Sequence, residues 1–181
     1  RSIESVLQEM RWNYEQNDTR IFNFEDDNLS FNSTWFTQFL KNVIDDDMLQ
    51  NIELTAMNGM CYPTLDGALL NLMYKAGFRQ LNLSYVTHDS VLRRKLNRPD
   101  RSKSFEKVVK AAQSFGFFVT AYLIFGLPEQ TYEEIKSSVD YLLSLGVLVG
   151  PSVFYIPPGS ALYHDMSLPP NVLDNWNLYR S

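Results

Sequence analysis

Acidic residues, glycines and prolines that could shape a binding site follow the expected strands of this sequence at their carboxyl ends. The segments that lead from a helix to the next strand carry only ordinary turn residues. The acidic turn 25–28 follows one apolar segment, and Gly126 with Pro128 follows the apolar run 119–125. A glycine allows a sharp turn or a close approach of the backbone to a ligand, and a proline cannot continue a sheet. In parallel sheets, ligands bind at the carboxyl ends of the strands. These turns are therefore the candidate binding site, and no nucleophile-base pair or Schiff-base lysine accompanies them.

Short apolar segments alternate with helical patterns along the whole chain. The expected strands are residues 20–24, 52–57, 80–86, 119–125 and 152–156. They recur roughly every thirty residues, and this alternation predicts a parallel sheet with right-handed crossovers. We expect Ser2, Thr64 and either Gln130 or Thr131 to cap helices at their N-termini, and Gly77 to end one. The sequence therefore predicts an α/β fold in a single domain, 1–181, with a less ordered tail at 165–181.

The composition argues against several classes of protein. The net charge of −5 disfavours a broad nucleic-acid surface, and no apolar stretch reaches the length of a transmembrane helix. Cys61 is the only cysteine, so the chain can form neither an internal disulfide nor a cysteine-based metal site by itself. We therefore expect no metal ligand within the chain, a cytoplasmic location and a small-molecule substrate as partner.

Five signatures occur in a fixed order, most of them at the strand ends. They are residues 2–10, 24–28, 77–99, 125–131 and 155–163. In this order they resemble the core of the radical S-adenosylmethionine (radical SAM) enzymes, and especially the branch that often carries a cobalamin-binding domain upstream. The turn 24–28 is similar to the family's Phe-x-Asp-Asp-Asn turn, and 125–131 is similar to its Gly-Leu-Pro-Gly-Glu-Thr turn. The resemblance implies a partial (βα) barrel of five parallel strands, which is a fragment of a six-stranded barrel.

Two departures from the family pattern affect the functional prediction. The three-cysteine motif that binds the iron-sulfur cluster is absent, so we expect a fragment cut after the cluster loop and inactive by itself. Residues 84–87 stand where the family usually has Gly-x-Glu-Ser. Val86 therefore replaces the carboxylate that the resemblance would place against the cofactor, and Thr87 offers a hydroxyl instead.

The resemblance implies that the full-length parent binds S-adenosylmethionine (SAM) and a [4Fe–4S] cluster, with cobalamin as a further candidate. The implied cofactor-binding residues are Glu25, Asp26, Asp27, Asn58, Ser84, Thr87, Arg98, Tyr122, Gly126, Pro128 and Pro157. The acidic turn would accept hydrogen bonds from the SAM ammonium, and Thr87 or Arg98 would bind its carboxylate. Asn58, Ser84 or Tyr122 would bind the ribose, and the glycine and proline turns would form a slot for adenine. No catalytic residue is assigned.

Several of the candidate residues also have a purely structural explanation. The acidic turn is typical of a solvated turn with an Asx-type hydrogen bond. Arg98 is equally suited to cap a helix or to pair with Asp100. Tyr122 fits a core position in a strand, and Gly126 with Pro128 fits simple turn geometry.

The sequence leaves two other functions open. A degenerate, non-catalytic barrel that binds a ligand or partner would explain the missing glutamate at the fourth family strand. An unrelated partial barrel with hydrolase or aldolase activity is a third alternative. If the first strand of the barrel is missing, the exposed edge of the sheet predicts a dimer.

Overall fold

The computed structural model describes residues 1–97, 102–156 and 159–165. The helices of this part of the chain are α1 (Ile3–Asn17), α2 (Ser33–Ile44), α3 (Gly67–Ala76), α4 (Ser90–Lys95), α5 (Ser102–Phe115), α6 (Tyr132–Ser144) and α7 (Ala161–Asp165), with a 3-10 turn η1 (Tyr62–Thr64). The strands are β1 (Ile21–Asn23), β2 (Glu53–Thr55), β3 (Gln80–Val86), β4 (Phe118–Phe125) and β5 (Leu148–Val153). Arg98, Pro157 and the tail beyond residue 165 lie outside the described residues, so the predictions made for them stay predictions.

All strand pairs in the described residues are parallel, which confirms the α/β prediction. One sheet has the order β1-β2 and the other has the order β3-β4-β5. Between the two sheets lie two isolated parallel bridges, Leu54 with Phe78 and Met60 with Leu83. Because the pairs are parallel, the carboxyl ends of the strands point the same way within each sheet.

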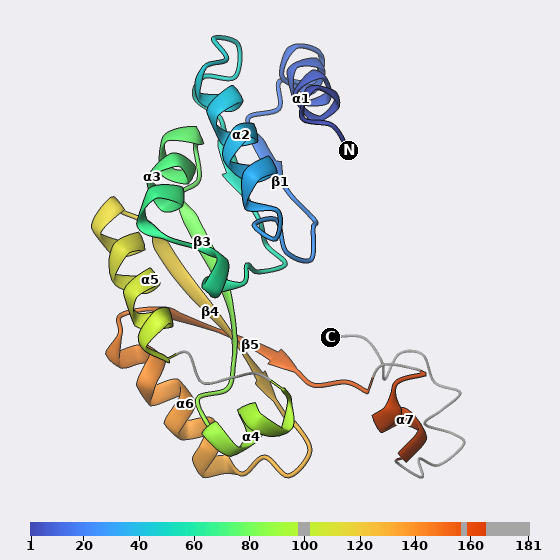
Figure 1. Ribbon diagram of the computed structural model, residues 1–181, viewed down its shortest axis with the longest axis vertical. Helices are drawn as coiled ribbons and strands as arrows, with labels where there is room; N and C mark the ends of the chain where they lie inside the picture. The colour runs from blue at the N-terminus through green and yellow to red at the C-terminus, as the bar shows by residue number, and fades with distance from the viewer. Residues whose placement is uncertain (98–101, 157–158, 166–181) are drawn as a thin grey trace.

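Helices cover one face of the three-stranded sheet, and the apolar core lies between these helices and the sheet. Figure 1 shows α5 and α6 on the same side of β3 and β4. Along β4, Val119, Ala121 and Leu123 are buried, whereas the alternate residues Thr120 and Tyr122 are only half-buried. Alternate side chains of a strand point to opposite faces, so β4 presents an apolar face to the helices and a more polar face to the other side. This second face carries the candidate site.

The helix ends confirm most of the capping predictions. Ser2 accepts a hydrogen bond from the Ser5 amide at the start of α1, and Thr131 forms a capping box with Glu134 at the start of α6. Gly77 ends α3 at φ +113°, and a Cβ there would lie 2.5 Å from the Ile52 carbonyl oxygen. Only glycine fits this position, because both the positive φ and the close approach exclude a side chain.

The prediction that Thr64 caps a helix was wrong. Thr64 lies in η1, where its hydroxyl donates a hydrogen bond to the Cys61 carbonyl oxygen at 2.7 Å. Asp66 caps α3 instead, since its carboxylate accepts a hydrogen bond from the Leu69 amide at 2.8 Å. Both residue types are good N-caps, and the 3-10 turn moves the helix start two residues along the chain.

The bounds predicted for the last strand were also wrong. The strand was expected at residues 152–156, but β5 begins at Leu148 and ends at Val153. Pro151 lies inside it and pairs with Leu123 in the register. A proline is tolerated here because β5 pairs only with β4 in the described residues, so the missing amide hydrogen faces the open edge.

Candidate functional site

The carboxyl ends of β1 and β2 are joined by the side chains of two asparagines. The Asn23 Oδ1 atom accepts a hydrogen bond from the Met57 amide at 3.1 Å. The Asn58 Nδ2 atom donates to the Glu25 carbonyl oxygen at 2.9 Å, and the Asn23 amide also donates to the Glu25 carboxylate. The loop 56–59 after β2 therefore holds the turn after β1 in place, although most of these side chains are exposed.

Tyr122 on β4 reaches the same loop from the other sheet. Its hydroxyl donates a hydrogen bond to the Met57 carbonyl oxygen at 2.9 Å. Ser84 is its register partner on β3, and the Ser84 amide donates to the Met60 carbonyl oxygen at 3.0 Å. The structure thus brings Glu25, Asn58, Ser84 and Tyr122, all predicted site residues, around the loop 56–59.

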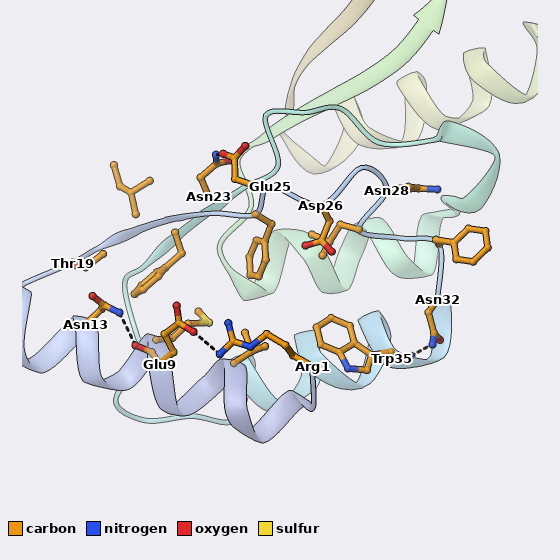
Figure 2. A pocket seen from close by; sticks show the side chains of 17 residues that line it. Arg1, Glu9, Asn13, Thr19, Asn23, Glu25, Asp26, Asn28, Asn32 and Trp35 are labelled. Atoms are coloured by element: carbon orange, nitrogen blue, oxygen red, sulfur yellow. Dashed lines mark hydrogen bonds and ion pairs between the residues drawn. The ribbon is translucent and has the colours of Figure 1, made fainter. Parts of the chain in front are cut away.

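A cleft of about 770 Å³ opens beside this group of residues, between α1 and the segment that contains β1. Figure 2 shows Arg1, Glu9 and Asn13 of the α1 side across from Asp26 and Asn28. The Arg1 guanidinium and the Glu9 carboxylate form an ion pair at 2.5 Å. The residues that line the cleft include Glu25, Asp26, Phe22, Phe24 and Trp35, but not Asp27. The cleft therefore combines exposed carboxylates with an apolar, aromatic wall.

Thr87 lies apart from this group, at the end of β3. Its side chain is fully buried, and its hydroxyl accepts a hydrogen bond from the Asp89 amide at 3.1 Å. The Arg93 Nε atom donates to the Thr87 carbonyl oxygen at 2.6 Å. Val86, directly before it, has φ +75°, a conformation that β-branched residues rarely adopt. The hydroxyl of Thr87 thus serves the turn that leads into α4.

Gly126 and Pro128 form a turn whose backbone groups are occupied by a side chain of the protein. The Gln130 Oε1 atom accepts hydrogen bonds from the amides of Gly126, at 2.8 Å, and Leu127, at 3.2 Å. Its Nε2 atom donates to the Ile124 carbonyl oxygen at 3.2 Å. Gly126 has φ +81°, and no atom lies within 4 Å of where its Cβ would be, so the turn is open to solvent while its amides are satisfied.

An ion pair connects this turn with α4. The Lys95 ammonium pairs with the carboxylate of Glu129, which has φ +63°. The hydrogen bond from Lys95, together with its charge, lowers the pKa of the Glu129 carboxyl. The ends of β3 and β4 are therefore tied to each other by contacts within the protein.

An aromatic network of the buried Tyr85 and the half-buried His88 and Tyr141 supports the other side of β3. The Tyr85 hydroxyl and the His88 Nδ1 atom are 2.8 Å apart, and the His88 ring stacks on Tyr141 with centroids 4.0 Å apart. The Tyr141 hydroxyl donates to the Glu106 carboxylate at 3.1 Å. Burial, together with the bond to Glu106, raises the pKa of Tyr141 to about 12. Tyr85 also packs against Phe105, so the network lies on the helix-covered face, away from the strand-end group.

Sequence reasoning missed Asn23 and Gln130. Asn23 is the last residue of β1, and its place directly before the acidic turn was the signal that could have identified it. Gln130 was considered only as a helix start, and its contact with the glycine turn depends on a side-chain rotamer.

Cys61 is a half-buried free thiol. Within residues 1–97, 102–156 and 159–165, no three His, Cys, Asp or Glu side chains are grouped so that they could hold a metal ion.

Comparison with known proteins gives one curated relative. No protein-family model matches the chain. Over 170 residues the chain is 22% identical to the bacteriochlorophyllide d C-12(1)-methyltransferase of Chlorobaculum tepidum, a match that covers 92% of this chain. The matched part spans 36% of the length of that relative.

No helix in the described part of this chain has the length and hydropathy needed to cross a membrane.

Solved structures with similar folds are radical SAM enzymes and a synthase. The radical SAM methyltransferase TsrM from Kitasatospora setae, solved with cobalamin and a [4Fe–4S] cluster, has a TM-score of 0.75 at 19% identity and covers 84% of this chain and 31% of its own. Coproporphyrinogen III oxidase (HemN) from Escherichia coli has a TM-score of 0.68 at 13% identity, covering 91% and 40%. Methylornithine synthase (PylB) has a TM-score of 0.63 at 18% identity, covering 88% and 46%. The fold of this chain is therefore that of the solved radical SAM enzymes, which confirms the predicted resemblance at the level of the fold.

Proposed function

We propose that this chain is the greater part of a radical SAM catalytic domain and that it holds SAM at the ends of β1 and β2. The observation that carries the proposal is the meeting of Glu25, Asn58, Ser84 and Tyr122 around one loop, beside a cleft that contains Asp26. The fold shared with radical SAM enzymes supports the same function.

The proposal requires a contribution from outside these residues. An iron-sulfur cluster is bound by thiolates, and the chain has the single cysteine Cys61, so the cluster ligands would belong to another part of a longer protein. When bound, the cluster reduces SAM and starts radical chemistry on a substrate. The bridges between Leu54 and Phe78 and between Met60 and Leu83 support a single curved, partial barrel of five strands.

The contacts favour the carboxyl ends of β1 and β2 as the place that binds the methionine part of SAM. Glu25 and Asp26 are exposed at the cleft, and their carboxylate or carbonyl oxygens would accept hydrogen bonds from the ammonium group. A role for Thr87 or Gly126 would require their turns to release the contacts with Asp89 and Gln130. Arg98 and Pro157 keep the roles proposed from the resemblance.

The test is reductive cleavage of SAM by the full-length protein reconstituted with iron and sulfide. The expected product is 5′-deoxyadenosine. Asp26→Ala should weaken SAM binding about five-fold, since it removes an acceptor for a charged group. Asp27→Ala is the matched control, because Asp27 is exposed and does not line the cleft. Absence of cleavage with the cluster cysteines present would exclude the function.

Methyl transfer is the reaction class that we propose to assay first. The curated relative and TsrM are both named methyltransferases, and TsrM was solved with cobalamin. Transfer of the methyl group of labelled SAM to an acceptor, with and without added cobalamin, would distinguish this reaction from oxidation of a substrate.

A non-catalytic binding module is the second candidate function. Val86 stands where the resemblance expects a glutamate, and it is buried in a left-handed conformation. The sequence of the longer protein separates the two candidates. A three-cysteine cluster motif in that sequence favours the enzyme, whereas its absence favours the binding module.

The open edge of β1 supports the predicted dimer. The Arg20 carbonyl and the Phe24 amide bond to β2 at 2.7 and 2.8 Å, so the alternate residues Ile21 and Asn23 direct their backbone groups to the other side. In the described residues β1 pairs only with β2. We propose that the 181-residue chain associates through this edge, and a monomer by light scattering at high concentration would exclude it.

A further inference from the structure

The ring of Tyr122 lies between two glycines from different parts of the chain. Gly150 on β5 is its register partner, and a Cβ there would lie 2.4 Å from the Tyr122 Cδ1 atom. A Cβ on Gly59 would lie 3.1 Å from the Tyr122 Cδ2 atom. Real Cβ atoms do not approach a ring carbon as closely as the first distance, so Gly150 leaves the space that the ring fills.

The hydroxyl of Tyr122 joins the tip of the loop 56–59 to β4. It donates to the Met57 carbonyl oxygen at 2.9 Å, while the Met57 amide donates to Asn23 at 3.1 Å. The next residue, Asn58, bonds to the Glu25 carbonyl oxygen. Met57 is 58% exposed, so packing contributes little to its position and these hydrogen bonds must define it. A continuous series of contacts thus runs from Tyr122 to the acidic turn.

The base of the loop is held independently. The Asn82 side chain donates to the Ala56 carbonyl oxygen at 3.3 Å, and the Met60 amide donates to the Asn82 carbonyl oxygen at 2.7 Å. Removal of the Tyr122 hydroxyl would therefore release the tip of the loop and leave its two ends in place.

We infer that Tyr122 is a positioning residue: its hydroxyl sets the tip of the loop 56–59 and, through Asn58, the position of the Glu25 backbone at the cofactor site. The hydroxyl acts on the ligand through the loop and does not itself bind the ribose. The effect on SAM binding rests on the proposed function, whereas the effect on the loop does not.

The first experiment measures amide hydrogen exchange by NMR in the 181-residue chain. Tyr122→Phe keeps the ring between the glycines and removes one hydrogen bond, so exchange of the Met57 amide should accelerate about five-fold. Gly150→Ala should have the same effect with the hydroxyl present, because the new Cβ displaces the ring. Tyr132→Phe, at an exposed position on α6, is the matched control. Unchanged exchange at Met57 in Tyr122→Phe would overturn the inference.

The second experiment measures SAM affinity in the cluster-loaded, full-length protein. Tyr122→Phe and Asn58→Ala should each raise the dissociation constant about five-fold, and the double variant should bind as weakly as the weaker single variant. Independent effects would multiply to about twenty-five-fold, and that result would contradict positioning through Asn58. If the wild-type protein does not bind SAM, the proposed function fails, and hydrogen exchange alone decides the role of Tyr122.

Discussion

The polar residues at the strand ends fall into two groups that use their hydrogen bonds differently. At the ends of β1 and β2, the side chains of Asn23 and Asn58 connect different strands and lie beside an open cleft. At the ends of β3 and β4, the groups of Thr87 and Gly126 are satisfied within their own turns, the latter by Gln130. We call these the β1–β2 side and the β3–β4 side.

The comparison separates residues that stabilise the fold from residues that are available to a ligand. A buried polar group with a partner stabilises the folded state, and its loss is costly. An exposed group that connects two loops contributes little to stability but fixes where its neighbours lie. We therefore expect substitutions on the β3–β4 side to change the free energy of unfolding and those on the β1–β2 side to change ligand affinity.

Arg93→Ala should give the largest effect. Arg93 is 3% exposed, donates to the Thr87 carbonyl oxygen and lies over the Tyr85 ring at 4.5 Å. Its truncation should lower the free energy of unfolding by about 3 kcal/mol, measured by urea denaturation. The neighbouring exposed Arg94→Ala should change it by less than about 0.5 kcal/mol. Equal effects of the two substitutions would remove the stabilising role assigned to the turn after β3.

Gln130→Ala should have the next largest effect. It removes three hydrogen bonds from the turn that contains Gly126, so we expect a loss of about 1.5 kcal/mol in the free energy of unfolding. Gln130→Glu keeps the acceptor for both amides and loses only the bond to Ile124, and it should cost less. A loss of stability in Gln130→Glu as large as that in Gln130→Ala would show that the two amides are not held by this side chain.

Asn58→Ala should weaken the binding of SAM with little change in the free energy of unfolding. Because Asn58 is exposed, the free energy of unfolding should change by less than about 0.5 kcal/mol. The dissociation constant for SAM in the full-length, cluster-loaded protein should rise about five-fold, measured by calorimetry. Asn71→Ala on α3 is the matched control. A destabilised variant with unchanged affinity would reverse the distinction between the two sides.

The smallest expected effect is a shift in the pKa of Glu129 when Lys95 is replaced by methionine. Its carboxyl is held below the usual pKa by the hydrogen bond from Lys95, so the ion pair contributes above the ordinary pKa of a glutamate and is lost as pH falls through the lowered value. Lys95→Met should return the pKa to its usual range in an NMR titration of the carboxyl carbon. Lys107→Met, exposed on α5, should leave it unchanged.

The sequence predicted the alternation of strands and helices well because apolar periodicity, caps and glycines are local signals. Gly77 was placed correctly from residue type and position alone, and Thr131 was one of two residues predicted to begin α6. Thr64 was misplaced because two good caps, Thr64 and Asp66, lie two residues apart and only the 3-10 turn distinguishes them. The start of β5 was placed too late, after Pro151, although the open edge of a sheet tolerates a proline inside a strand.

The candidate site could be predicted only as a set of strand ends. The resemblance named Asn58 and Tyr122 without their contacts, since the bond from Tyr122 to Met57 joins residues 65 positions apart. Whether a polar group is open to a ligand depends on rotamers and on neighbours distant in the sequence. For this reason Thr87 and Asp26 were equivalent candidates in the sequence, whereas the structure buries Thr87 and leaves Asp26 at the cleft.

The most direct test is the hydrogen-exchange footprint of SAM on the full-length, cluster-loaded protein. Our account predicts added protection at residues 24–28 and 56–59 when SAM is bound, with little change at 87–89. Protection confined to 87–89 and 126–130, with 24–28 and 56–59 unchanged, would contradict the assignment of the cofactor site to the β1–β2 side.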